Sequence, residues 1–208
     1  MCRIGSIKSK VPVHPSKALH LMLPQQEGHD NSGFAMVMQD LYGIFSTYKD
    51  KPLLSMACTQ KGNQMVEEYM DSHNFVQLAE WIPVPNKEPG LDIQAMPYYV
   101  FRNYDFPEHY NELSQKEKED VLLNTRLALR KLLEDAGEGY VYSFWPDVLT
   151  LKEIGDPRDI ATYFHLWEDN GCLSAKNIVV QCRQNTNYDI VRYAAHPFFL
   201  QGYTLCAN

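Results

Sequence analysis

The chain begins with Met1-Cys2-Arg3-Ile4-Gly5-Ser6-Ile7, a run in which apolar residues alternate with other types. This alternation predicts a β-strand with one buried face at the start of the fold. Cys2 is a small residue directly after the first methionine, so removal of Met1 would leave a thiol and a free α-amine on one residue. Such an amine has an unperturbed pKa of about 8 and can accept a proton near neutral pH. We therefore consider Cys2 a candidate N-terminal nucleophile, the alternative being a cysteine without a chemical role.

The composition is that of an ordinary globular protein. The 208 residues (24.0 kDa) are 45% hydrophobic and 22% charged, which is sufficient for one substantial core. A net charge of −7 without a basic cluster argues against a nucleic-acid partner. The sequence contains neither a run of about 18 to 20 apolar residues, as a membrane span would need, nor an apolar signal region. We therefore expect a cytoplasmic protein with no membrane partner.

The cysteines and histidines give no sign of a disulfide framework or a metal site. Five cysteines without a CxxC pair predict free thiols in a reducing compartment, and seven histidines show no HExxH motif. Phosphate loops of the GxGxxG and GxxxxGK kinds are absent. We expect no metal and no cofactor in this chain. Cys2 should be the most reactive thiol, and four others are expected to be slow, as buried structural thiols are: Cys58, Cys172, Cys182 and Cys206.

Periodicity and turn residues predict a single domain over residues 1–208, in which strands and helices both recur, so its class is α+β or α/β. The clearest element is a helix that begins at the capping box Ser114–Glu117 and ends at Gly137. Other helices are predicted at 15–23, at 63–72 with Asn63 as cap, and at 157–170 after the cap Asp156. Strands are predicted at 1–7, 32–39, 41–48, 53–58, 96–104, 140–151 (one or two strands), 177–181 and 198–206, with a proline-rich loop at 81–92.

Four short motifs follow one another along the chain: residues 1–5 (MCRIG), 27–33 (EGHDNSG), 181–187 (QCRQNTN) and 195–208, which starts AHPF and ends LCAN. Together they resemble the class II glutamine amidotransferase domain, whose members begin Met-Cys-Gly-Ile. The long segment between the second and third motifs is most similar to the amidotransferase domain of glutamate synthase. The resemblance implies an α+β fold, a four-layer αββα sandwich of the N-terminal-nucleophile hydrolase type, incomplete at its C-terminus.

The resemblance also implies roles for individual residues. Cys2 would attack the side-chain amide of glutamine, form a thioester and release ammonia. Arg183, helped by Thr186, would hold the α-carboxylate of glutamine, and the Asn208 side chain would stabilise the oxyanion. The other implied residues form a turn that supports the site: Gly28, Asp30 and Gly33. The implied function is a glutaminase that passes ammonia to a glutamate synthase-like partner subunit, without a cofactor in this chain.

The chain departs from the family pattern at several positions. Arg3 replaces a glycine, Glu27 replaces an arginine, and Cys182 replaces the His or Ser before the arginine. The chain ends at Asn208, whereas the family continues with a glycine that donates to the oxyanion and an aspartate that holds the substrate amine. Two alternatives therefore stay open. One is a non-catalytic interaction subunit that keeps the fold, and the other is an N-terminal-nucleophile amide hydrolase with a different substrate.

Assayed alone, the 208-residue chain is expected to release little glutamate from glutamine, because loss of one oxyanion donor costs roughly 10²–10³ in rate. We also expect it to self-associate, as a homo-oligomer, through the unpaired edge of the strand predicted at 198–206. A chain extended past Asn208 should be active and better behaved. Robust turnover by the 208-residue form would show that the required groups come from elsewhere in the chain.

Overall fold

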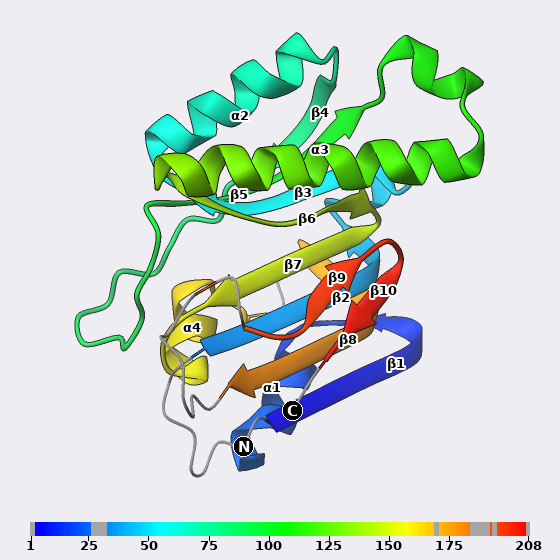
Figure 1. Ribbon diagram of the computed structural model, residues 1–208. Coiled ribbons are helices and arrows are strands. Elements are labelled where there is room, and N and C mark those ends of the chain that lie inside the picture. Colours follow the sequence, from blue (N-terminus) through cyan, green and yellow to red (C-terminus); the bar gives the residue numbers. More distant parts are fainter. Residues whose placement is uncertain (1–2, 26–32, 169–170, 184–191, 193–194, 207–208) are drawn as a thin grey trace.

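The computed structural model describes residues 3–25, 33–168, 171–183, 192 and 195–206, which form antiparallel sheets covered by helices (Figure 1). The predicted α+β class is confirmed. All pairings between the described strands are antiparallel, which rules out a doubly wound parallel sheet for this part of the chain. None of the described helices is long and apolar enough to cross a membrane.

The first sheet has the strand order β1, β8, β2, β7. Its members are β1 (Arg3–Val13), β8 (Leu173–Arg183), β2 (Gly33–Gly43) and β7 (Val148–Glu153). The strand predicted at 1–7 is confirmed from Arg3 onward and continues to Val13, and the one predicted at 177–181 is part of β8. Alternate residues of β2, among them Phe34 and Met36, enter one large core, so the two-residue period of the strand sets the buried face.

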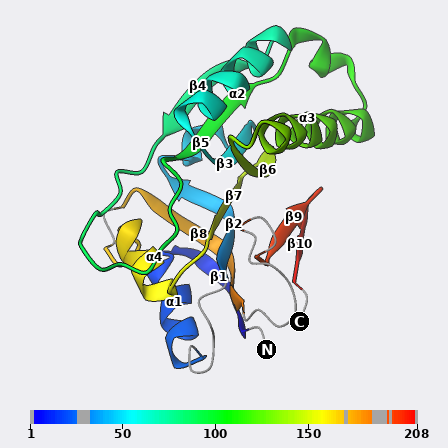
Figure 2. The same ribbon diagram turned by 60° about the vertical axis from the view of Figure 1, so that its left-hand side comes forward.

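Helices α1 (Ser16–Met22) and α4 (Pro157–Tyr163) cover this face of the first sheet, and Figure 2 shows both on the same side of it. Leu19 of α1 and Ile160 of α4 are fully buried there. The same core also contains Leu53 and Phe101 of the second sheet, so it joins the two sheets. The helix predicted at 15–23 is confirmed, whereas α4 ends at Tyr163, well before residue 170, because His165 takes a left-handed φ of +53°.

The second sheet has the order β4, β5, β3, β6 and is covered on its outer face by two helices (Figure 1). Its members are β4 (Val76–Trp81), β5 (Tyr98–Asp105), β3 (Pro52–Cys58) and β6 (Gly139–Pro146), and the helices are α2 (Gln60–Ser72) and α3 (Gln115–Ala136). The capping box of Ser114 and Glu117 is present, and α3 ends at Gly137 with a left-handed φ of +68°, both as predicted. Leu129 and Leu133 of α3 pack with Met56 in a second core.

The two sheets meet where β6 continues into β7 through Asp147. This residue has a left-handed φ of +55°, and its Oδ1 accepts a hydrogen bond from the Leu41 backbone N–H at 2.7 Å. Ser55 Oγ of β3 accepts a hydrogen bond from the Thr150 backbone N–H of β7 at 3.1 Å. The predicted strand region 140–151 is thus two strands, and its corner holds the sheets together.

Short elements complete the described chain. Three 3₁₀ turns occur at η1 (Leu23–Gln25), η2 (Ser46–Tyr48) and η3 (Glu108–Glu112). The single strand predicted at 198–206 is wrong: β9 (Phe198–Leu200) and β10 (Tyr203–Leu205) form a hairpin. Its turn residues Gln201 and Gly202 both have positive φ, as tight two-residue hairpins require. Phe199 packs on Val37 and Val148, so β9 covers the other face of the first sheet.

Two further predictions need correction, and one strand was not predicted. The strands predicted at 32–39 and 41–48 are one strand, because Asp40 takes a φ of +55° while β2 stays in register with β8 on both sides of it. Thr59, not Asn63, caps α2, since its side chain accepts a hydrogen bond from the Gly62 N–H at 3.0 Å. The loop predicted at 81–92 follows a strand, β4, that the sequence pattern did not indicate.

The end of β7 is joined to the loop before β5 by a close backbone contact at Gly155. The Asp156 N–H donates to Asp92 O at 2.8 Å, and Gly155 has a φ of +142° with a bridge to Ile93. A side chain on Gly155 would collide with the Asp92 carbonyl oxygen, whereas one on Gly90 (φ +92°) would enter open space. Of these two glycines, only Gly155 therefore combines an unfavourable φ for other residues with a steric clash.

We expect Gly155→Ala to lower the free energy of unfolding by at least about 2 kcal/mol, because it adds overpacking to an unfavourable φ. The matched control Gly90→Ala carries backbone strain alone and should cost about 1 kcal/mol. Urea unfolding of both variants measures the difference. Equal losses would contradict the close contact between Gly155 and Asp92.

Candidate functional site

The ends of the four strands of the first sheet line up in one row. Arg3, the first residue of β1, pairs with Cys182 of β8. Cys182 pairs with Phe34 of β2, and Phe34 pairs with Glu153, the last residue of β7. Residues that are up to 179 positions apart in the sequence (Arg3 and Cys182) are thus neighbours along one edge. This edge is the candidate site.

Two of the residues singled out from the sequence lie together at this edge. Arg183 is the last residue of β8, and its backbone pairs with Gly33, the first residue of β2. The third motif and the end of the second motif therefore meet in the fold, next to the strand that carries the first. The other predicted site residues lie outside the described residues: Cys2, Gly28, Asp30, Thr186 and Asn208.

Glu153 is the centre of a buried polar network at the same edge. Its side chain is completely buried, and its Oε1 accepts hydrogen bonds from Arg192 Nε at 2.6 Å and from the Ile154 N–H at 2.8 Å. Tyr99 Oη donates to Glu153 Oε2. Arg192 also donates to the Gln94 carbonyl oxygen. The network ties the chain after β8 to β7, to β5 and to the loop before β5.

The surroundings of Glu153 have opposing effects on its protonation. Burial raises the pKa of its carboxyl to about 7, while Arg192 and the Ile154 N–H act in the opposite direction. The Arg192 pair therefore compensates only part of the desolvation of Glu153. A carboxyl with such a pKa changes its charge near neutral pH.

Lys152 precedes Glu153 and lies on the opposite face of β7, as strand alternation requires. Its side chain is also buried, and its Nζ donates to the Ala195 carbonyl oxygen at 2.6 Å and lies 3.7 Å from the centre of the Phe198 ring. Burial, together with the positive charge of Arg126, lowers the pKa of Lys152 well below its ordinary value. The two charged residues that end β7 thus contact Arg192 and Ala195 from opposite faces of the sheet.

Sequence reasoning did not single out Lys152, Glu153 or Arg192. A signal was present, because the strand Val148–Glu153 ends an apolar run with two adjacent charges, and all six of its residues are buried. Adjacent charges on alternating faces of a fully buried strand must both find partners inside the protein. The partners could not be named from the sequence, since Arg192 and Ala195 lie about 40 positions away.

The described cysteines differ in exposure. Cys58 and Cys182 are buried, and burial raises the pKa of each thiol to about 12, so both are poor nucleophiles at neutral pH. Cys172 is half-buried. Cys206 follows β10 and is exposed, unlike the buried thiols with which the sequence grouped it.

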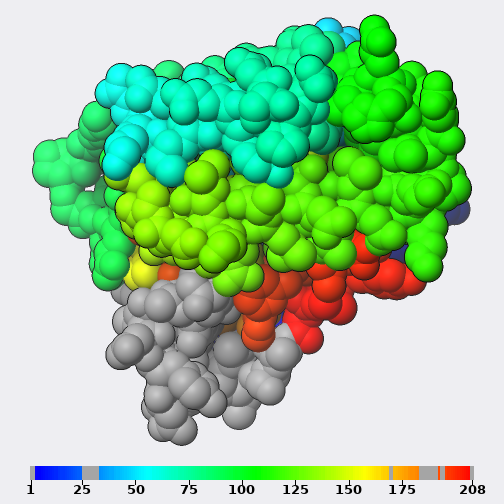
Figure 3. Space-filling model, turned by 45° about the horizontal axis from the view of Figure 1, so that its top comes forward, coloured from blue at the N-terminus to red at the C-terminus, as the bar shows by residue number. Residues whose placement is uncertain are grey.

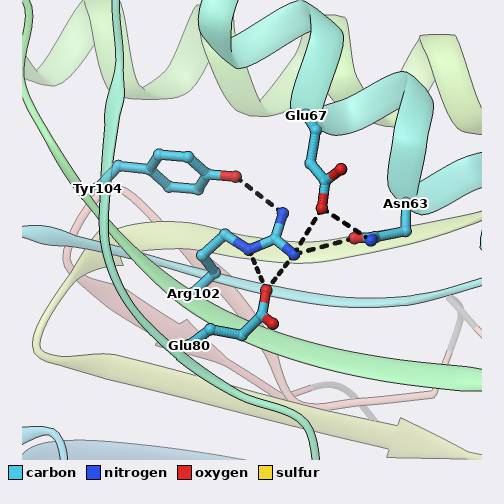
Figure 4. Close-up of polar contacts among 5 residues, drawn as sticks. All are labelled: Asn63, Glu67, Glu80, Arg102 and Tyr104. Atoms are coloured by element: carbon cyan, nitrogen blue, oxygen red, sulfur yellow. Dashed lines mark hydrogen bonds and ion pairs between the residues drawn. The ribbon is translucent and has the colours of Figure 1, made fainter.

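A second polar cluster ties α2 to the second sheet (Figure 4). The fully buried Arg102 donates to Glu80, to Tyr104 Oη at 3.2 Å, and to Asn63 Oδ1 and Glu67 Oε1, each at 3.1 Å. Burial acts to lower the pKa of Arg102, but Tyr104 and Glu80 outweigh it and raise the pKa above its ordinary value. Each nitrogen of this guanidinium has a protein partner. We therefore interpret the cluster as structural, and Arg102 is a poor candidate for binding a substrate carboxylate.

Comparisons with known proteins give one distant relative and no activity. No family model matches the chain. It is 28% identical over 170 residues to an uncharacterized protein of Archaeoglobus fulgidus, a match that covers 80% of this chain and 42% of the archaeal protein. The chain thus matches less than half the length of that relative. In the described residues no group of three or more His, Cys, Asp or Glu side chains could hold a metal ion.

The raised pKa of Glu153 predicts a specific pH dependence of stability. The folded protein keeps the Glu153 proton up to about pH 7, whereas the unfolded chain releases it near the ordinary value of 4.5. Stability from this group therefore falls as the pH rises from 4.5 to 7 and is constant above that, a loss of at most about 3 kcal/mol. Chemical denaturation at pH 5 and pH 8 should show this loss of stability in the wild type. The Glu153→Gln variant should not show it. The exposed-carboxylate control Asp135→Asn should behave like the wild type, and an unchanged pH dependence in Glu153→Gln would contradict the assignment.

Proposed function

We propose that this chain is a glutamine amidotransferase unit of the N-terminal-nucleophile class. After removal of Met1, the Cys2 thiol gives its proton to its own α-amine and attacks the side-chain amide carbon of glutamine. A carbon–sulfur bond forms, the carbon–nitrogen bond breaks, and the amine returns the proton to the departing ammonia. Water then hydrolyses the thioester to glutamate and restores the thiol.

The alignment of the strand ends carries this proposal. Cys2 directly precedes Arg3 in the sequence, and Arg3 pairs with Cys182, the neighbour of Arg183. Neighbouring strands lie about 4.8 Å apart, a spacing comparable to the length of a glutamine molecule. A nucleophile at the start of β1 and a carboxylate-binding arginine at the end of β8 therefore suit the two ends of one substrate. Random placement of the two motifs would rarely give this register.

Two buried arginines of the described chain already have carboxylate partners in the protein, so neither competes with Arg183 for the α-carboxylate. Arg102 is engaged with Glu80 and Glu67, and Arg192 is engaged with Glu153. In the proposal Arg183 forms the bidentate contact, assisted by Thr186, and Asn208 stabilises the oxyanion. In the proposal Gly28 and Asp30 belong to a turn beside the nucleophile, and Gly33, the first residue of β2, follows that turn.

The proposed fold is the αββα sandwich of N-terminal-nucleophile hydrolases. It is supported by α2 and α3 over the outer face of the second sheet. It also requires a helical layer over the face of the first sheet that β9 covers, because α1 and α4 pack on the face that contributes to the shared core. We further propose a cytoplasmic protein whose ammonia passes to a glutamate synthase-like partner, since free ammonia is largely protonated at neutral pH and lost to solvent. The match to only 42% of the archaeal protein is compatible with a unit that works beside other domains.

The proposal is tested by labelling with a diazo-ketone analogue of glutamine, which needs both the thiol and the carboxylate contact. We expect the adduct on Cys2, with Arg183→Lys lowering the labelling rate by about tenfold or more, the value of a charge-assisted hydrogen bond. Reaction of Cys2 with iodoacetamide, which has no α-carboxylate, should stay unchanged in this variant. The exposed Arg158→Lys serves as the matched control and should label like the wild type.

Three results would contradict the proposal. An adduct mainly on another cysteine would assign the reactive thiol elsewhere. Equal labelling rates in Arg183→Lys and wild type would remove the arginine from substrate binding. Absence of any adduct on a Cys2 whose Met1 has been removed, as checked by mass spectrometry, would favour a non-catalytic interaction subunit.

A further inference from the structure

Strand β4 is the open edge of the second sheet. It pairs with β5 on one side, and no other described strand pairs with it. In the described part of the chain, no backbone hydrogen bond from a loop reaches residues 76–81 either. The opposite edge of the sheet is closed, because β6 continues into β7 and the ring of its Trp145 lies 5.9 Å from the ring of Phe199. An unpaired strand edge can add a strand from another molecule.

The two faces of the second sheet are already covered. Its inner face contributes Leu53 and Phe101 to the core that it shares with the first sheet. Its outer face is covered by α2 and α3, whose side chains form two adjoining rows in Figure 3. In the described structure, β4 is therefore the part of this sheet that is left for a partner.

The edge at β4 is less protected than the edge at β1. Strand β1 is the edge of the first sheet, and it carries the exposed residues Lys8, Lys10 and Pro12. Lysines and prolines disfavour the addition of a further strand. Strand β4 contains neither residue type, and its single charge, Glu80, forms an ion pair with Arg102 of the neighbouring strand.

The side chains of β4 match the same strand running in the opposite direction. A β-bulge interrupts its pairing with β5, so Val76 and Trp81 lie on one face of the sheet, and Gln77 and Glu80 lie on the other. Residues that are opposite each other in an antiparallel pair share a face. Val76 of each copy can therefore pair with Trp81 of the other copy. Gln77 then pairs with Glu80, so that no like charges meet.

The two ends of β4 are complementary as well. An open hollow of about 520 Å³ borders Val76, the first residue of the strand, and is lined in part by Phe106 and Pro107. After the other end of the strand, the apolar residues Ile82 and Val84 are 40% and 79% exposed. A two-fold axis through the middle of β4 brings these residues of one copy to the hollow of the other copy.

We propose that two copies of this chain form a dimer by antiparallel pairing of their β4 strands about a two-fold axis. The two second sheets then join into one continuous sheet that ends at a closed β6 edge on both sides. Because the same surface of both copies is used, association stops at the dimer. The interface includes neither the strand-end site nor the β9–β10 hairpin, so this proposal does not depend on the proposed glutaminase chemistry.

The test is sedimentation velocity of the purified chain over a range of protein concentrations, with amide exchange measured at both ends of the range. We expect a monomer–dimer equilibrium. Amides of residues 76–81 should exchange more slowly at high concentration, because the dimer protects their backbone. A wild-type chain that stays monomeric over the whole range would overturn the proposal.

Variants locate the interface. Val76 is 59% exposed, so Val76→Lys should fold normally. It should raise the Kd of the dimer by about tenfold or more, because the two-fold axis places the lysine at two contacts of the interface. The matched control is Val11→Lys at the β1 edge, where the valine is 64% exposed, and it should dimerise like the wild type.

A third variant tests the hairpin as the alternative interface. Tyr203 of β10 is 72% exposed, and Tyr203→Lys should leave the dimer unchanged. A dimer that is weakened by Tyr203→Lys or Val11→Lys but not by Val76→Lys would place the contact on another edge and overturn the proposal. Full dimer affinity in all three variants would overturn it as well.

Discussion

The fold depends on the corner at which β6 continues into β7. Asp147 adopts a left-handed conformation there, and its carboxylate accepts the Leu41 N–H, which fixes the direction in which the chain enters the first sheet. The Ser55 hydroxyl then holds β7 close to β3. Because β7 belongs to the first sheet and also contacts β3 of the second, every one of its residues is buried. Its last two residues, Lys152 and Glu153, are charged and therefore lie in the interior. Their partners Arg192 and Ala195 lie near the candidate site.

Burying these charges is costly, and the structure uses their partners to position the chain after β8. Glu153 binds Arg192, Lys152 binds the Ala195 carbonyl, and Arg126 of α3 binds the Phe199 carbonyl. Removing one member of a buried pair typically costs about 3–5 kcal/mol, because the other charge is left uncompensated. Arg192, Ala195 and Phe199 are therefore held by contacts that tolerate little substitution.

The sequence was informative where local rules dominate. The capping box at Ser114 and the terminal Gly137 determine α3 within the chain itself, and apolar runs located most strands. It was uninformative where distant partners decide: Asp40 continues a strand because β8 stays paired across it, and Asn63 serves Arg102 instead of capping α2. For the site, the structure pairs Arg183 with Gly33, two residues that the sequence assigned to one site without predicting this contact. The buried network of Glu153 and Arg192 could not be anticipated, since residue type alone does not show which charges fold inside.

The two consecutive charged residues at the end of β7 connect the candidate strand-end site to both faces of the first sheet. Phe34 pairs with both Cys182 and Glu153, so the carboxylate that fixes Arg192 lies two strands from β8 along the same edge. Lys152 directly precedes Glu153 and lies on the other face of the sheet, where its Nζ is over the Phe198 ring. Lys152 in turn donates to the Ala195 carbonyl oxygen, three residues after Arg192. A change at either of these adjacent residues of β7 is therefore felt at both Arg192 and Ala195, since each is held by a direct hydrogen bond.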